Sequence, residues 1–143
     1  MSKVAVIFWT STGNTETMAN AVLEGAKEVD ASAELFNVAD ISASDAANYD
    51  TLLVGCPAMG AEELEESEFE PFFAELEGSL SGKNVGLFGS YGWGDGEWMR
   101  SWAERTAAAG AKLVSEEGVM ANEDPDDDAL AACRELGKAA AAL

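Results

Sequence analysis

Short apolar runs alternate along this chain with segments whose apolar residues recur at helical spacing. The runs 4–8, 51–56 and 85–89 are almost wholly apolar, as expected for strands buried on both faces of a sheet. Weaker strand patterns occupy 33–38 and 112–119, and a Glu-Glu-Gly sequence within the second predicts an interruption or a bulge. Because crossover helices cover both faces of a parallel sheet, this alternation predicts an α/β fold.

Amphipathic helices are predicted between and after these strands, over 14–28, 68–76, 97–109 and 126–143. In the second of them, Phe69, Phe72, Phe73 and Leu76 share one helical face. No repeat, linker or low-complexity segment divides the chain. We therefore expect a single domain over residues 1–143, which is long enough to enclose a sizeable core.

The composition limits the possible partners. With 48% hydrophobic residues the chain is not expected to be disordered, despite a formal net charge of -19 from 8 basic and 27 acidic residues. Nucleic acid and anionic membranes are unfavourable partners for such a charge, whereas proteins with basic docking surfaces are favourable ones. The first apolar run is too short for a signal peptide or a membrane span, so we expect a cytoplasmic protein. Cys56 and Cys133 are expected to be buried, reduced thiols.

A hydroxyl-rich hexapeptide follows the first apolar run directly and precedes the first predicted helix: Thr10, Ser11, Thr12, Gly13, Asn14 and Thr15. Such a turn can hold an anion, since the free N–H groups and the positive end of the helix dipole point toward it. The hexapeptide contains no Lys or Arg and is not a Walker A loop. The alternative is an ordinary strand-to-helix connection with a capping residue.

Two further loops follow predicted strands and have unusual compositions. The first is Pro57-Ala58-Met59-Gly60-Ala61-Glu62, in which Met59 offers a polarizable thioether. The second, residues 89–96, places Tyr91 and Trp93 among four glycines, so that backbone and aromatic rings can approach a flat ligand. Alternatively, Met59 packs into the core and Trp93 anchors its loop. Together with the hexapeptide, the loops suit a flat heteroaromatic ring with a phosphorylated tail.

These motifs resemble those of the short-chain, clostridial-type flavodoxins, and the resemblance extends from about Lys3 to the C-terminus. It implies a flavodoxin-like three-layer sandwich with a five-stranded parallel sheet of order 2-1-3-4-5, for which flavodoxin itself is a standard example. It also implies a noncovalent FMN between Met59 and Trp93, with residues 10–15 around the phosphate and Glu62 at the pyrimidine edge. The other implied FMN-binding residues are Pro57, Ala58, Gly60, Ala61, Ser90, Tyr91, Gly92, Gly94 and Asn122.

The resemblance implies a low-potential one-electron carrier, not an enzyme, that passes between the quinone, semiquinone and hydroquinone states. Gly60 is expected to turn its carbonyl toward flavin N5 on reduction, and the absence of a cation in the hexapeptide is expected to lower the hydroquinone potential. The partners would be reductases and oxidoreductases, and the protein would be a monomer. The alternative is a flavodoxin-like NAD(P)H:quinone reductase. A phospho-receiver domain is disfavoured, because no phosphoacceptor Asp follows the third predicted strand.

A run of acidic residues adjoins the second loop: Glu62, Glu63, Glu65, Glu66, Glu68 and Glu70. Two interpretations remain open for it. The run is either a solvated face or an acidic rim that docks basic redox partners.

Overall fold

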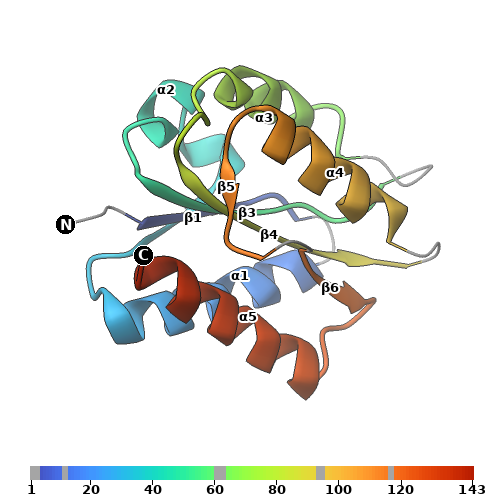
Figure 1. Cartoon of the computed structure of the whole chain (residues 1–143). Coiled ribbons are helices and arrows are strands. Elements are labelled where there is room, and N and C mark those ends of the chain that lie inside the picture. Colours follow the sequence, from blue (N-terminus) through green and yellow to red (C-terminus); the bar gives the residue numbers. More distant parts are fainter. Residues whose placement is uncertain (1–3, 11–12, 60–63, 93–95, 116–117) are drawn as a thin grey trace.

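A parallel β-sheet lies between two layers of helices in the computed structural model, which describes residues 4–10, 13–59, 64–92, 96–115 and 118–143 (Figure 1). Its strands are β1 (Val4–Phe8), β2 (Glu34–Asn37), β3 (Thr51–Gly55), β4 (Asn84–Tyr91), β5 (Lys112–Leu113) and β6 (Val119–Asn122). They run in the order β2-β1-β3-β4-β5, and β6 also pairs with β4. The predicted fold class and strand order are confirmed.

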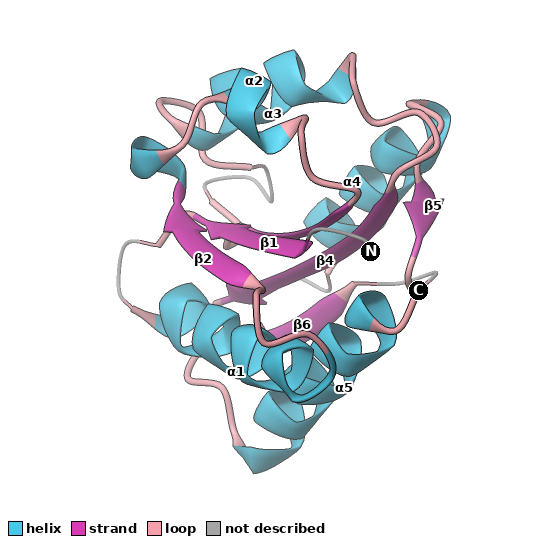
Figure 2. Ribbon diagram, turned by 90° about the vertical axis from the view of Figure 1, so that its left-hand side faces the viewer, coloured by secondary structure: helices cyan, strands magenta, loops and turns pink. Residues whose placement is uncertain are grey.

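The helices divide between the two faces of the sheet. On one face lie α1 (Asn14–Val29) and α5 (Asp127–Ala141); the other is covered by α2 (Ala43–Ala46), α3 (Phe69–Glu77) and α4 (Glu97–Ala108) (Figure 2). The four predicted helices are confirmed, with ends that differ by at most two residues. The short helix α2 and the 3-10 turn η1 (Val38–Asp40) were not predicted, because neither is long enough to show a periodic pattern.

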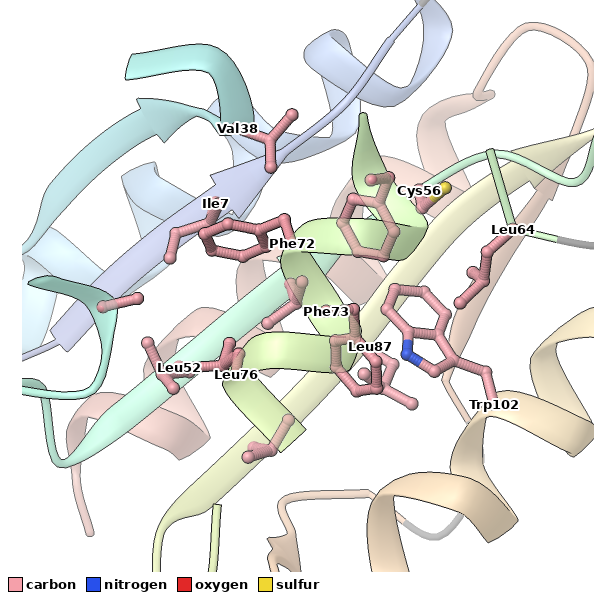
Figure 3. Packing of buried hydrophobic residues seen from close by; sticks show 14 of the residues in the cluster. Ile7, Val38, Leu52, Cys56, Leu64, Phe72, Phe73, Leu76, Leu87 and Trp102 are labelled. Carbon is pink, nitrogen blue, oxygen red and sulfur yellow. The ribbon is translucent and has the colours of Figure 1, made fainter. Parts of the chain in front are cut away.

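The core consists of two apolar clusters, one on each face of the sheet. Alternate residues of one strand enter different clusters, as Ile7 and Val6 do in β1. In the cluster under α3 and α4, Phe69 and Phe73 stack on each other and both meet Trp102 edge-on (Figure 3). The continuous apolar runs follow directly from this two-sided burial.

The helices α1 and α5 pack closely because each has a glycine at the contact. A Cβ added at Gly25 would collide with the carbonyl oxygen of Arg134, and one added at Gly137 would collide with that of Val22. The two helices therefore pack closely against each other on one face of the sheet.

Two strands differ from their predicted bounds. The fifth strand is in two pieces, β5 and β6, which pair with opposite halves of β4, so the predicted interruption is confirmed and the strand extends to Asn122. β4 reaches Tyr91, which means that Ser90 and Tyr91 belong to a strand end and not to the predicted loop 89–96. The extra length follows from pairing with β6, a contact distant in sequence. No helix in the described ranges has the length and apolarity that crossing a membrane requires.

Candidate functional site

A pocket of about 490 Å³ opens beyond the carboxyl ends of the central strands. It is bordered by the first residue of α1, by the segment after β3, by the end of β4 and by the segment after β6. The lining residues are Asn14, Pro57, Ala58, Met59, Ser90, Tyr91, Gly92, Glu123 and Asp124. This is the edge at which doubly wound sheets bind ligands, at the point where the strand order reverses.

The N-terminus of α1 is built to leave its backbone donors available. Gly13 is the N-cap and has φ 98°, a left-handed conformation in which a side chain is strained. It supplies no side-chain cap, and among the described residues no atom beyond its chain neighbours lies within 4 Å of the position that a Cβ would occupy. The Gly13 N–H donates to the Thr10 hydroxyl oxygen at 3.0 Å, which closes the turn. The first N–H groups of an α-helix have no intrahelical acceptor, so the N-terminus of α1, without a side-chain cap at Gly13, is a candidate anion site.

Ser90 joins three of the segments that form the pocket. Its hydroxyl lies 3.2 Å from that of Thr15 in α1, and both side chains are buried. Its carbonyl oxygen accepts the N–H of Ala58 at 2.9 Å. The end of β4 thus holds both α1 and the segment after β3 in place, a role that its position in a glycine-rich stretch did not reveal.

The remaining side of the pocket comes from the segment after β6. Glu123 has φ 56°, an uncommon conformation for a non-glycine residue, and its N–H donates to the Tyr91 carbonyl oxygen at 2.7 Å. Asn122 also reaches that oxygen, with its side-chain nitrogen at 3.5 Å. The sequence analysis missed Glu123 and Asp124. Their position in the sequence, directly after Asn122 and the last strand, could have indicated that they border the pocket.

The predicted site residues fall into three groups. Seven of them line the pocket: Asn14, Pro57, Ala58, Met59, Ser90, Tyr91 and Gly92. Four are described close by, in the turn, in α1 or at the end of β6: Thr10, Gly13, Thr15 and Asn122. The others lie outside the described residues: Ser11, Thr12, Gly60, Ala61, Glu62, Trp93 and Gly94.

The described part of the site fits a flat ring with a phosphorylated tail. The open N-terminus of α1 can receive the phosphate, because its first N–H groups lack intrahelical acceptors. Ala58, Met59 and Tyr91 give the pocket apolar and aromatic walls against which a ring can pack. The volume lies in the range of cofactor pockets.

The acidic run has structural contacts at three of its members. Glu65 is only 6% exposed and lies at the start of α3. Glu68 accepts a hydrogen bond from the Trp9 indole at 3.1 Å, and Glu70 forms a two-point ion pair with Arg105 at 2.7 Å. Glu66 is exposed. The members of the run therefore differ in their surroundings, and the buried Glu65 cannot meet a docking partner directly. Glu62 and Glu63 lie outside the described residues.

Both cysteines are buried and free. Burial raises the pKa of each thiol, Cys56 and Cys133, to about 12, so both stay protonated near neutral pH. The predicted pair of buried, reduced thiols is confirmed.

Comparisons with known proteins find relatives that match nearly the whole chain. The family model for flavodoxin matches residues 6–137. The chain is 49% identical over 138 residues to the flavodoxin of Megasphaera elsdenii, covering 96% of this chain and 98% of that one. It is 46% identical over 133 residues to the flavodoxin of Clostridium beijerinckii, covering 93% and 95%. The solution structure of two-electron reduced Megasphaera elsdenii flavodoxin superposes with a TM-score of 0.89 at 48% identity, over 98% of this chain and 99% of that one.

Proposed function

Since the chain belongs to the flavodoxin family, we propose that it carries single electrons at low potential between partner redox enzymes. Like the members of that family it binds FMN, and it is an electron-transfer protein rather than an enzyme. FMN supplies the redox chemistry when it is bound, and the protein supplies position, access and electrostatics.

The pocket beside the N-terminus of α1 is the observation that carries this proposal. The phosphate of FMN would bind there, on the N–H groups that the Gly13 cap leaves open and on the hydroxyls of residues 10–15. Met59 would face one side of the ring, and Trp93 would face the other. Backbone groups of Ser90, Tyr91 and Gly92 would border the ring edge.

Acidic residues near the pocket support a low potential. Glu123 and Asp124 line it, and no Lys or Arg is among the described residues that do. Negative charge on a reduced cofactor would therefore be opposed by these carboxylates and left unneutralised by the pocket walls. The reduced cofactor would consequently donate its electrons more readily, which means that its reduction potential is lower.

Partners with basic surfaces would dock around the pocket opening, attracted by a net charge of -19. Exposed carboxylates such as Glu66, Glu123 and Asp124 are the candidates for this contact. Charge reversal at Glu66 should slow association with a flavoenzyme reductase at low ionic strength, and added salt should reduce the difference from the unmodified protein. If the Glu66 variant and the unmodified protein associate at equal rates at low salt, Glu66 is a solvated surface residue that does not contribute to docking. We place this exchange in the cytoplasm, where free thiols persist.

A direct test measures flavin binding and redox behaviour in the purified protein. We expect a yellow protein with one FMN per chain, and a reductive titration that resolves two one-electron steps. Steady-state oxidation of NAD(P)H in the presence of a quinone should be negligible. Rapid oxidation of NADH or NADPH in this assay, with no other enzyme added, would instead favour the alternative of a quinone reductase.

A further inference from the structure

Glu65, four residues before α3, is a buried glutamate. One carboxylate oxygen accepts the N–H of Glu68 at 2.7 Å and that of Phe69 at 2.9 Å. The other accepts the N–H of Ser67 at 2.7 Å and also the Ser67 hydroxyl. A negative charge therefore lies at the positive end of α3 and binds the N–H groups of the first helical residue and of the two residues before it.

The start of a helix is usually stabilised by the side chain of its N-cap residue, but α3 differs in this respect. The N-cap of α3 is Glu68, and its side chain makes no capping hydrogen bond. Glu65, three residues earlier, instead accepts N–H groups just before and at the first residue of the helix, and its own carbonyl oxygen accepts the N–H of Glu70 at 2.8 Å. The start of α3 is thus fixed by a residue of the preceding loop, so that loop and helix hold each other.

The other end of the loop is fixed by Cys56, the residue just after β3. The Glu65 N–H donates to the Cys56 sulfur at 3.4 Å, and the Cys56 carbonyl oxygen accepts the Trp98 indole N–H at 3.2 Å. Cys56 and Leu64 belong to the same apolar cluster and lie at the same end of it (Figure 3). The two ends of segment 57–64 are therefore joined.

We propose that Glu65 is a positioning residue for FMN: with Cys56 it joins the ends of segment 57–64, so that Met59 faces the pocket before the cofactor binds. An open segment would have to be ordered when the ring binds, and that entropy loss would weaken binding. A segment already closed at its ends loses less. The inference rests on the proposed function in one respect, that the pocket holds FMN.

The test compares Glu65→Ala and Glu65→Gln with Glu75→Ala and Glu75→Gln, since Glu75 is an exposed residue of α3. In the apoprotein, Glu65→Ala should accelerate amide hydrogen exchange of residues 58–59 and 64–69 about tenfold, while β1, β3 and β4 keep their protection. Its dissociation constant for FMN should rise about tenfold. Glu65→Gln should show a smaller change, because its amide oxygen still accepts a hydrogen bond, and the Glu75 variants should match the unmodified protein.

Two results would overturn the proposal. Equal acceleration of exchange in the sheet and in segment 57–69 would make Glu65 a residue of general stability. An unchanged dissociation constant, despite faster exchange in the segment, would show that the closed segment does not matter for FMN. Should Glu65→Ala not fold, Cys56→Ala removes the sulfur at the other end of the segment. Its hydrogen exchange and its dissociation constant for FMN are then interpreted by the same criteria. If the unmodified protein bound no FMN, the proposed function would fail as well, and the exchange data would still decide whether Glu65 closes the segment.

Discussion

The hydroxyl oxygens of Thr15 and Ser90 lie 3.2 Å apart in the interior of the protein, although 75 positions separate them in the sequence. One belongs to the first turn of α1 and the other to the end of β4. Because Ser90 lines the pocket, this hydrogen bond connects the anion site at the helix N-terminus with the wall of the ring site.

Replacing Thr15 with valine tests this connection. The change keeps the shape of the side chain but leaves the Ser90 hydroxyl buried without its partner, which should cost about 1–3 kcal/mol of folding free energy. FMN affinity should fall about tenfold, measured by fluorescence titration, because the helix N-terminus is no longer held against β4. Ser101→Ala is the control, since Ser101 is an exposed residue of another helix, α4. If affinity is unchanged in both variants, the hydrogen bond serves stability alone.

A second prediction concerns the left-handed cap of α1. Gly13→Ala has space for its methyl group but not the preferred backbone angle, so it should lose about 1–2 kcal/mol in urea unfolding. Gly82→Ala is a matched control, because Gly82 also has a positive φ, 81°, and no atom beyond its chain neighbours lies within 4 Å of the added Cβ. Gly82 precedes β4 and so lies near the amino ends of the strands, opposite the pocket. Both variants should be destabilised, and only Gly13→Ala should weaken FMN binding. Equal FMN affinity in the two would remove Gly13 from the anion site.

The carboxyl group of Glu65 predicts a pH dependence. Burial alone would raise its pKa, but hydrogen bonds from Ser67, Phe69 and Glu68 outweigh burial and lower the pKa from 4.5 to about 2. A lowered folded-state pKa means that Glu65 stabilises the fold fully above pH 4.5 and that this contribution disappears as the pH falls through 2.

The stability difference between the unmodified apoprotein and Glu65→Gln should therefore shrink on acidification. Between about pH 6 and about pH 3 we expect a decrease of roughly 2 kcal/mol in urea unfolding. Comparing the two proteins cancels the titration of the other carboxylates, and Glu75→Gln provides the control. A difference that is constant over this range would contradict the assigned pKa.

The carboxylates beside the pocket predict a shift in redox potential. Replacing Glu123 with glutamine and Asp124 with asparagine removes two negative charges from the pocket wall. The potential of the second one-electron couple should rise by on the order of 20 mV per charge, by Coulomb's law at about 10 Å in a mostly aqueous surrounding. Redox titration measures this shift, and added salt should reduce it. Glu75→Gln, on the far half of α3, should leave the potential unchanged, and an equal shift there would point to net charge alone.

Much of the fold could be predicted because it depends on patterns local in sequence. The runs at β1, β3 and β4 are apolar throughout because both faces of each strand are buried, and the helical stripes mark the faces turned toward the sheet. The split of the fifth strand was predicted from its Glu-Glu-Gly sequence, since two acidic residues and a glycine interrupt the strand pattern. The pocket's position then followed from strand order.

The roles of individual polar residues could not be predicted in the same way. Glu65 resembles its acidic neighbours in sequence, yet it is buried because the first turn of α3 and the Cys56 sulfur surround it. Ser90 was expected in a loop, but pairing with β6 extends β4 to Tyr91. Glu123 reaches the pocket through a backbone turn that its own identity does not encode.

The sequence by itself determined the α/β class, the places of the main strands and helices and the three segments that meet at the site, since burial periodicity and turn chemistry are properties of neighbouring residues. The strand order was implied by the family resemblance. Only the tertiary structure decided which hydroxyl meets Ser90, which carboxylate is buried at α3 and which acids border the pocket. Those contacts join residues far apart along the chain, and a polar side chain's function depends on the partners that folding brings to it.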